Sequence, residues 1–134
     1  MSNRPASFFR SRIKAFGYAL SGWWYVIRTQ RNAWIHMVVS ITVILMSFIL
    51  HISASNWALI LLAIALVWIA EFLNTALEAV VDLASNHQQH ELAKLGKDVG
   101  AAAVLIAAVS SIIIGLLVLG PPLWAVIKSL FYMH

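Results

Sequence analysis

The chain has 134 residues, of which 62% are hydrophobic and 10% charged, and its net charge is +4. A soluble domain is usually about 45–50% apolar, so this composition excludes an ordinary soluble protein and indicates one small membrane domain. The chain has no cysteine, which excludes disulfides and thiolate metal sites. The charge does not predict nucleic-acid binding, because six of the nine Lys and Arg residues fall in the first 31 residues, beside the first apolar segment.

Residues 5–28 are predicted to form one amphipathic helix. Apolar side chains recur there at intervals of three and four, while basic and polar side chains occupy another face. This pattern is typical of a helix lying on a membrane, with Trp23, Trp24 and Tyr25 at headgroup level. An ordinary surface helix packed on the protein is an equally open interpretation.

Three apolar segments follow, at about 35–52, 57–83 and 99–119, and each is predicted to cross the membrane as a helix. The predicted fold class is therefore an all-α membrane protein with a surface helix and three transmembrane helices, in a single domain covering residues 1–134. His36 and His51 lie at the two ends of the first span, where polar residues cost little, so both are interpreted as interfacial and not as metal ligands.

The third span is bounded by two features of the sequence. Residues 84–98 are predicted to form a polar loop before it, and Pro121-Pro122 is predicted to end it. Small residues recur along one face of this span and predict a close approach to another helix: Gly100, Ala103, Ala107, Ser111 and Gly115.

The distribution of Lys and Arg residues orients the chain. The N-terminal segment has six, the 84–98 loop has two, the 51–56 turn has none and the C-terminal tail has one. By the positive-inside rule, the N-terminus and the 84–98 loop are predicted to be cytoplasmic.

Four polar residues share one face of the second span: Glu71, Asn74, Glu78 and Asp82. An acid near a bilayer centre costs about 2.5–3.5 kcal/mol on insertion scales, so acids in a spanning helix indicate function. The simpler interpretation is a row of carboxylates in the headgroup layer. That suits Asp82 but not Glu71, which lies about 16 Å further along the helix axis.

This polar stripe and the Lys97-Asp98 pair supply the parts for phosphoryl transfer, which needs a base, Mg²⁺ ligands and a cation for the phosphates. The usual nucleotide motif is absent, since Gly96-Lys97 is followed by Asp98 in place of Ser or Thr. A proton-coupled transporter using Glu71 and Glu78 as a relay stays open, although three spans are unlike the repeats of transporters. A non-enzymatic assembly subunit also stays open, but leaves the acids unexplained.

Two motifs carry a resemblance to a known family. They read Glu71-x-x-Asn74-x-x-x-Glu78-x-x-x-Asp82 and Glu91-Leu92-Ala93-x-x-x-Lys97-Asp98-x-Gly100-Ala101-Ala102-Ala103-Val104-Leu105. This signature resembles that of the prokaryotic diacylglycerol kinase family, whose members are small, membrane-embedded and unrelated to soluble kinases. A third motif, Arg31-Asn32-x-x-x-His36, is similar to the undecaprenol kinase branch.

The resemblance implies a homotrimer of three-helix subunits in the bacterial inner membrane, with active sites shared between neighbours. It implies ATP as phosphoryl donor together with Mg²⁺, and a membrane lipid alcohol as acceptor, either diacylglycerol or undecaprenol. Carried over by position, Glu71 is the base for the lipid hydroxyl and Asn74 positions groups at the reacting centre. The residues implied to contact ATP are Tyr18, Glu78, His90, Glu91, Lys97 and Asp98.

The metal site implied by the resemblance contains Glu78, and it departs from the family at its second position. There the family's glutamate aligns with Gln30, which offers only a neutral oxygen to Mg²⁺. A second departure lies in the surface helix, where an arginine often found in the family falls on Ser11, and Arg10 or Arg12 is the expected substitute. Asp82 has an open role, for which the interpretation offered is a structural one, such as pairing across subunits.

Overall fold

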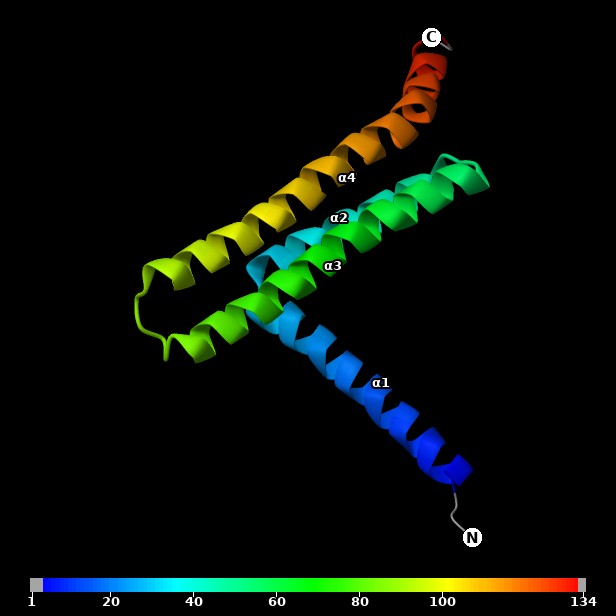
Figure 1. The fold of residues 1–134 in the computed structure, drawn as a ribbon. Helices are drawn as coiled ribbons and strands as arrows, with labels where there is room; N and C mark the ends of the chain where they lie inside the picture. Colours follow the sequence, from blue (N-terminus) through cyan, green and yellow to red (C-terminus); the bar gives the residue numbers. More distant parts are fainter. Residues whose placement is uncertain (1–3, 133–134) are drawn as a thin grey trace.

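The computed structural model describes residues 4–132, with side chains described from Arg10 onward, and forms four helices over that range. These are α1 (Arg4–Thr29), α2 (Arg31–Ile49), α3 (Ala54–Ala84) and α4 (Glu91–Tyr132). Figure 1 shows α2, α3 and α4 running side by side, while α1 leaves this bundle at a steep angle from its junction with α2.

Three of these helices, α2, α3 and α4, are long and apolar enough to cross a membrane. This confirms the predicted all-α architecture with three apolar spans. Their outer faces carry large exposed side chains, such as Leu62 at 66%, Leu105 at 65% and Leu117 at 71%. Apolar surface on this scale suits contact with lipid or with a neighbouring subunit, and not with water.

The breaks between helices have local causes. Gln30 has an extended backbone between α1 and α2, and its side chain makes no capping hydrogen bond to α2. Ser53 begins α3 by accepting a hydrogen bond from the backbone N–H of Asn56 at 3.3 Å. Asn86 and His87 adopt left-handed backbone angles, φ 50° and 58°, which reverse the chain toward α4.

The predicted polar loop at 84–98 is wrong in its extent, because α4 already begins at Glu91. The residues from Glu91 to Lys97 are mostly good helix formers, and Glu91 lies in the first turn, where a negative charge favours the helix dipole. The polarity of this stretch therefore marks the part of α4 beyond the apolar span and does not mark the absence of a helix.

The prediction that Pro121 and Pro122 end the third helix is also wrong, since α4 continues through both to Tyr132. Figure 1 shows α4 changing direction toward its C-terminal end. A proline inside a helix removes a backbone hydrogen bond and bends the helix, and membrane helices tolerate such bends. Apolar residues on both sides of the two prolines let the helix resume.

The small-residue face of α4 packs against α3. Gly100 and Ala107 are buried, and the Ser111 hydroxyl donates to the carbonyl oxygen of Ala63 at 2.9 Å. A Cβ atom at Gly100 would collide with the Oδ1 atom of Asn74. The predicted close approach is therefore present, and it brings the first turns of α4 beside the polar stripe of α3.

The last turns of α1 are packed against α2 and α3 through apolar side chains. Val26 is 3% exposed and forms one core cluster with Ala33 of α2 and Trp68 of α3. The ring of Trp23 lies 4.7 Å from the ring of Trp68 and 4.9 Å from that of Phe72, measured between centroids. This junction covers α3 at the level of Glu71.

Candidate active site

The polar stripe of α3 runs from a buried end to a half-buried end. Glu71 is 1% exposed and Asn74 is 9% exposed, while Glu78 and Asp82 are half-buried. A fully buried carboxylate is costly unless it has partners. The burial of Glu71 therefore marks the inner end of the stripe as the candidate reaction centre.

Glu71 faces His36 of α2 at this inner end. The Nε2 atom of His36 lies 3.7 Å from the Oε2 atom of Glu71, and neither buried atom has a hydrogen-bond partner among the residues that the structure describes. Unpaired buried polar atoms are rare in proteins and are often explained by a ligand or a catalytic role. The sequence prediction of an interfacial His36 misses this contact, although the Arg31-Asn32-x-x-x-His36 motif was a signal that could have found it.

The ring and backbone of His36 are positioned by neighbouring side chains. The Ser40 hydroxyl donates to the carbonyl oxygen of His36 at 2.6 Å, and the indole N–H of Trp68 donates to Ser40 at 3.3 Å. The rings of His36 and Trp68 meet edge to face, 6.3 Å between centroids. Trp68 is in turn packed against the ring of Trp23, which also contacts Phe72, so His36 is backed by a cluster of aromatic rings.

Glu78 is held by two amide groups. Gln30 donates its side-chain N–H to Oε2 at 3.1 Å, and Asn74 donates to Oε1 at 3.0 Å. The Oδ1 atom of Asn74 is buried and has no hydrogen-bond partner in the described range of residues. The prediction that Gln30 approaches Glu78 is confirmed. Because the Gln30 side chain is bonded to Glu78, it does not cap the N-terminus of α2.

The donor set around Glu78 can be tested against Mg²⁺. No group of three or more His, Cys, Asp or Glu residues that could hold a metal lies within the described part of the chain. Mg²⁺ is usually bound by one or two carboxylates together with phosphate and water oxygens. One carboxylate, flanked by two amides that can rotate to present oxygen, fits a magnesium ion that arrives with a nucleotide.

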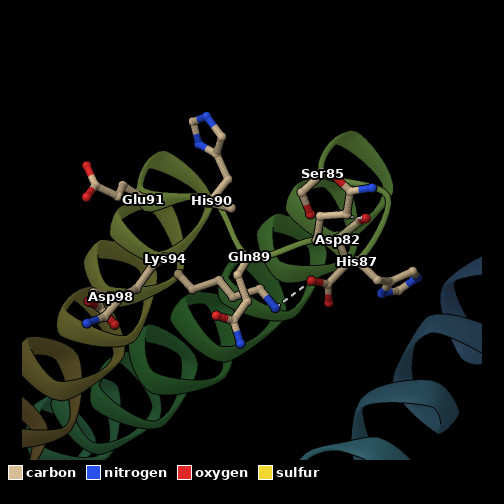
Figure 2. Close-up of a pocket in the computed structure, with 11 residues that line it drawn as sticks. Asp82, Ser85, His87, Gln89, His90, Glu91, Lys94 and Asp98 are labelled. Carbon is tan, nitrogen blue, oxygen red and sulfur yellow. Dashed lines mark hydrogen bonds and ion pairs between the residues drawn. The ribbon is translucent and has the colours of Figure 1, made fainter.

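A second group of polar side chains lines a pocket of about 700 Å³ between the end of α3 and the start of α4. This volume is in the range of small-molecule sites. Figure 2 shows Asp82 on the α3 side and Lys94 and Asp98 on the α4 side, with His90 and Glu91 at the start of α4. The Nζ atom of Lys97 and the Oδ1 atom of Asp82 form an ion pair, 2.5 Å apart, across this pocket.

His90 has a structural role in this pocket as well. Its Nδ1 atom accepts a hydrogen bond from the backbone N–H of Leu92 at 3.1 Å, and its carbonyl accepts from Lys94. His90 therefore caps α4 and fixes the edge of the pocket. Asp82 forms an ion pair with Lys97 of the same chain, so within one subunit the partner of Asp82 is Lys97.

The structure thus places the predicted residues in three positions. Gln30, Asn74 and Glu78 meet through hydrogen bonds, and Glu71 lies further in along the stripe, beside His36. Lys97, Asp98, His90 and Glu91 line the pocket at the outer end of the stripe, where Asp82 lies. Tyr18 is brought to neither, since its side chain on α1 is 75% exposed and does not line the pocket.

A model of the prokaryotic diacylglycerol kinase family matches residues 17–119, which include the whole stripe and the pocket. The chain belongs to this family. A family relative named diacylglycerol kinase, from Synechocystis sp., is 46% identical over 111 residues, which are 83% of this chain and 63% of that protein. The match therefore spans less than two thirds of the length of this relative.

Two further relatives in the diacylglycerol kinase family match over most of their length. An undecaprenol kinase from Bacillus subtilis is 41% identical over 111 residues, 83% of this chain and 89% of the relative. A diacylglycerol kinase from Escherichia coli K12 is 36% identical over 120 residues, 84% of this chain and 91% of the relative. Relatives of this chain are thus named for two different lipid alcohols.

Proposed function

We propose that the protein is an ATP-dependent membrane lipid kinase that transfers the terminal phosphoryl group of ATP to the hydroxyl of a lipid alcohol. The observation that carries this proposal is the arrangement along α3. A buried carboxylate, Glu71, lies beside His36 at one end, and a pocket with the cation Lys97 lies at the other. Such an arrangement suits a reaction between an apolar alcohol and a charged nucleotide.

Glu71 acts as the base in this proposal. The hydroxyl of the lipid gives its proton to Glu71 as its oxygen bonds to the terminal phosphorus of ATP, and the bond from that phosphorus to the ADP oxygen breaks. Asn74 lies one turn further along the same face and positions the reacting groups, with its unpaired Oδ1 atom available to them. A positioned base contributes about 10²–10⁴ in rate.

Glu78 is the main magnesium ligand of the proposal, with Gln30 or Asn74 as neutral ligands after rotation of the amide. When bound, Mg²⁺ neutralises charge on the phosphate oxygens and orients them. Glu78 lies one helical turn from Asp82, which lines the pocket. This spacing suits an ATP molecule whose adenine ring occupies the pocket while its phosphates extend along α3.

The nucleotide is contacted by Lys97, Asp98, His90 and Glu91, which line the pocket. Lys97 has to exchange its partner Asp82 for a phosphate, and both side chains are accessible, at 40% and 35% exposure. Since exposed ion pairs contribute only about 0–1 kcal/mol, this exchange costs little.

The active unit is proposed to be a homotrimer in the bacterial inner membrane, with the N-terminus and the 84–98 segment in the cytoplasm. The exposed apolar faces of α2, α3 and α4 supply surface for subunit contact as well as for lipid. Tyr18 then contacts the nucleotide of a neighbouring subunit, since it does not line the pocket of its own. A proton-coupled transporter gains no support from the family comparison.

Diacylglycerol and undecaprenol are the two proposed acceptors, and the names of the relatives include both. The test is incubation of the purified protein with γ-labelled ATP, Mg²⁺ and each lipid in separate reactions. Label in phosphatidate or in undecaprenyl phosphate would support the proposal and assign the acceptor. Intact ATP with both lipids, under conditions in which the Bacillus subtilis relative is active, would contradict it.

A further inference from the structure

We propose that His36 receives the proton that Glu71 takes from the lipid hydroxyl and passes it out of the site. This inference rests on the proposed kinase function and adds a residue to it. The carboxylate of Glu71 is 1% exposed, so a proton bound there has no direct route to water. The base has to be emptied before each new turnover, and therefore a neighbouring group has to accept the proton.

His36 is the neighbour placed to do this. Its Nε2 atom lies 3.7 Å from Oε2 of Glu71, and within the described part of the chain both atoms lack a hydrogen-bond partner. This separation is longer than a hydrogen bond, which is about 2.7–3.2 Å, but catalytic hydrogen bonds are often long in the absence of substrate and shorten when it binds. In the tautomer with a proton on Nδ1, Nε2 has a free lone pair toward Glu71.

The surroundings of His36 favour a proton-transfer role over a metal or structural role. The charged groups on the facing side of α3 are Glu71 and, two turns further along, Glu78, whereas the aromatic ring that adjoins His36 is the uncharged indole of Trp68. The His36 side chain is 15% exposed, against 1% for Glu71. It also lies in the second turn of α2, close to the polar start of that helix at Arg31 and Asn32.

The proposed sequence balances without another reactant. The lipid O–H bond breaks, its proton moves to Glu71, and the phosphoryl group moves from ATP to the lipid oxygen, which leaves ADP. The proton then moves from Glu71 to Nε2 of His36 as the carboxyl group turns toward it, and the Nδ1 proton leaves to water. His36 then holds its proton on Nε2, and exchange of this proton for one on Nδ1, through water, restores the lone pair toward Glu71 before the next turnover. Phosphoryl transfer itself thus precedes the step that His36 performs.

That order gives a specific test with His36→Gln, which keeps the size and polarity of the side chain but cannot carry a proton. With γ-labelled ATP and rapid quenching, the variant should form one phosphorylated lipid per active site at the parent rate. It should then continue at a steady rate lower by about 10²-fold, the range of a lost acid–base group. His36→Ala should show the same burst, and added imidazole should restore its steady rate at least about tenfold.

The matched control is His51→Asn, which changes the histidine at the other end of the α2–α3 hairpin and should leave both phases unchanged. Asparagine is chosen because residue 51 has a positive φ of 49°. Size-exclusion elution volume and thermal unfolding in detergent check that each variant is folded. If His36→Ala does not fold, the burst of His36→Gln alone tests whether His36 accepts the proton from Glu71.

Two results would overturn the inference while leaving the kinase proposal intact. A first turnover as slow as the steady state, with no burst, would show that His36 positions Glu71 or the lipid. An unchanged steady rate would remove His36 from the reaction. A parent protein that phosphorylates no lipid alcohol would overturn the proposed function itself.

Discussion

Gln30 has two roles. Its extended backbone separates helix α1 from helix α2, and its side-chain amide donates a hydrogen bond to Glu78 at 3.1 Å. A carboxylate at this position would attract Mg²⁺ more strongly than a neutral amide does. The site is therefore expected to require more Mg²⁺ than one built on two carboxylates.

Substitution of Gln30 tests this expectation. Gln30→Glu should lower the Mg²⁺ concentration that gives half the maximal rate, because it adds a second carboxylate beside Glu78. Gln30→Leu should raise that concentration, because it removes a neutral ligand. The measurement is a lipid-kinase assay titrated with Mg²⁺ at fixed ATP. Midpoints that stay within about twofold of the parent in both variants would remove Gln30 from the metal site, and a lower midpoint in Gln30→Leu would show that its amide competes with the metal.

At the scale of single residues, the stripe on α3 could be predicted because helical periodicity alone places Glu71, Asn74 and Glu78 on one face. The partner of Glu71 could not, because His36 comes from another helix and its contact depends on the register between α2 and α3. The partner of Asp82 could not be predicted either, because only the pairing of α3 with α4 brings Lys97 to it.

The pairing of α3 and α4 depends on Gly100, where the two helices come closest to the reaction centre. A Cβ atom there would collide with Oδ1 of Asn74 and lie 3.2 Å from Cδ2 of Leu77. Asn74 is short and its amide is bonded to Glu78, so it cannot move aside without losing that hydrogen bond.

Gly100→Ala should therefore destabilise the protein by about 1–3 kcal/mol, the usual cost of overpacking, and lower kcat by displacing Asn74. The matched control is Gly115→Ala on the same face of α4, where an added Cβ meets no atom within 4 Å. That change should be neutral or slightly stabilising, since Ala favours a helix. Unfolding in detergent and kcat check both variants, and equal behaviour of the two would show that α3 and α4 do not approach this closely.

At the scale of elements, three spans follow from the apolar content of the sequence, but the ends of α4 do not. The sequence prediction treated polar residues 91–98 as loop and the two prolines as a stop, whereas α4 contains both. Apolarity reports where a helix lies in the membrane, and a helix can extend beyond that region on either side when its residues favour helix formation.

For the whole molecule, the orientation in the membrane decides whether the pocket at the α3–α4 turn meets cytosolic ATP. The excess of Lys and Arg in the N-terminal segment and near this turn predicts a cytoplasmic location for both. Because the chain has no cysteine, single cysteines report on accessibility without a background.

Cysteine at Gln88, which is exposed in the α3–α4 turn, should resist an impermeant thiol reagent in intact cells and react after permeabilisation. Cysteine at Ser55, exposed in the first turn of α3, should react in intact cells. Ser55 is preferable to Ser53, whose side chain caps the helix. Reversed labelling of the two positions would put the pocket on the side without ATP and contradict the kinase proposal.

The central claim is that the buried carboxylate of Glu71 is the base of a lipid kinase, and Glu71→Gln tests it most directly. Glutamine keeps the shape of the side chain but cannot accept the proton, so turnover of the lipid acceptor should fall by about 10²–10⁴-fold. The oligomeric state and ATP binding should stay those of the parent, because the Lys97 pocket is separate from this position. A turnover within about threefold of the parent would contradict the account, since a lost base costs far more than that.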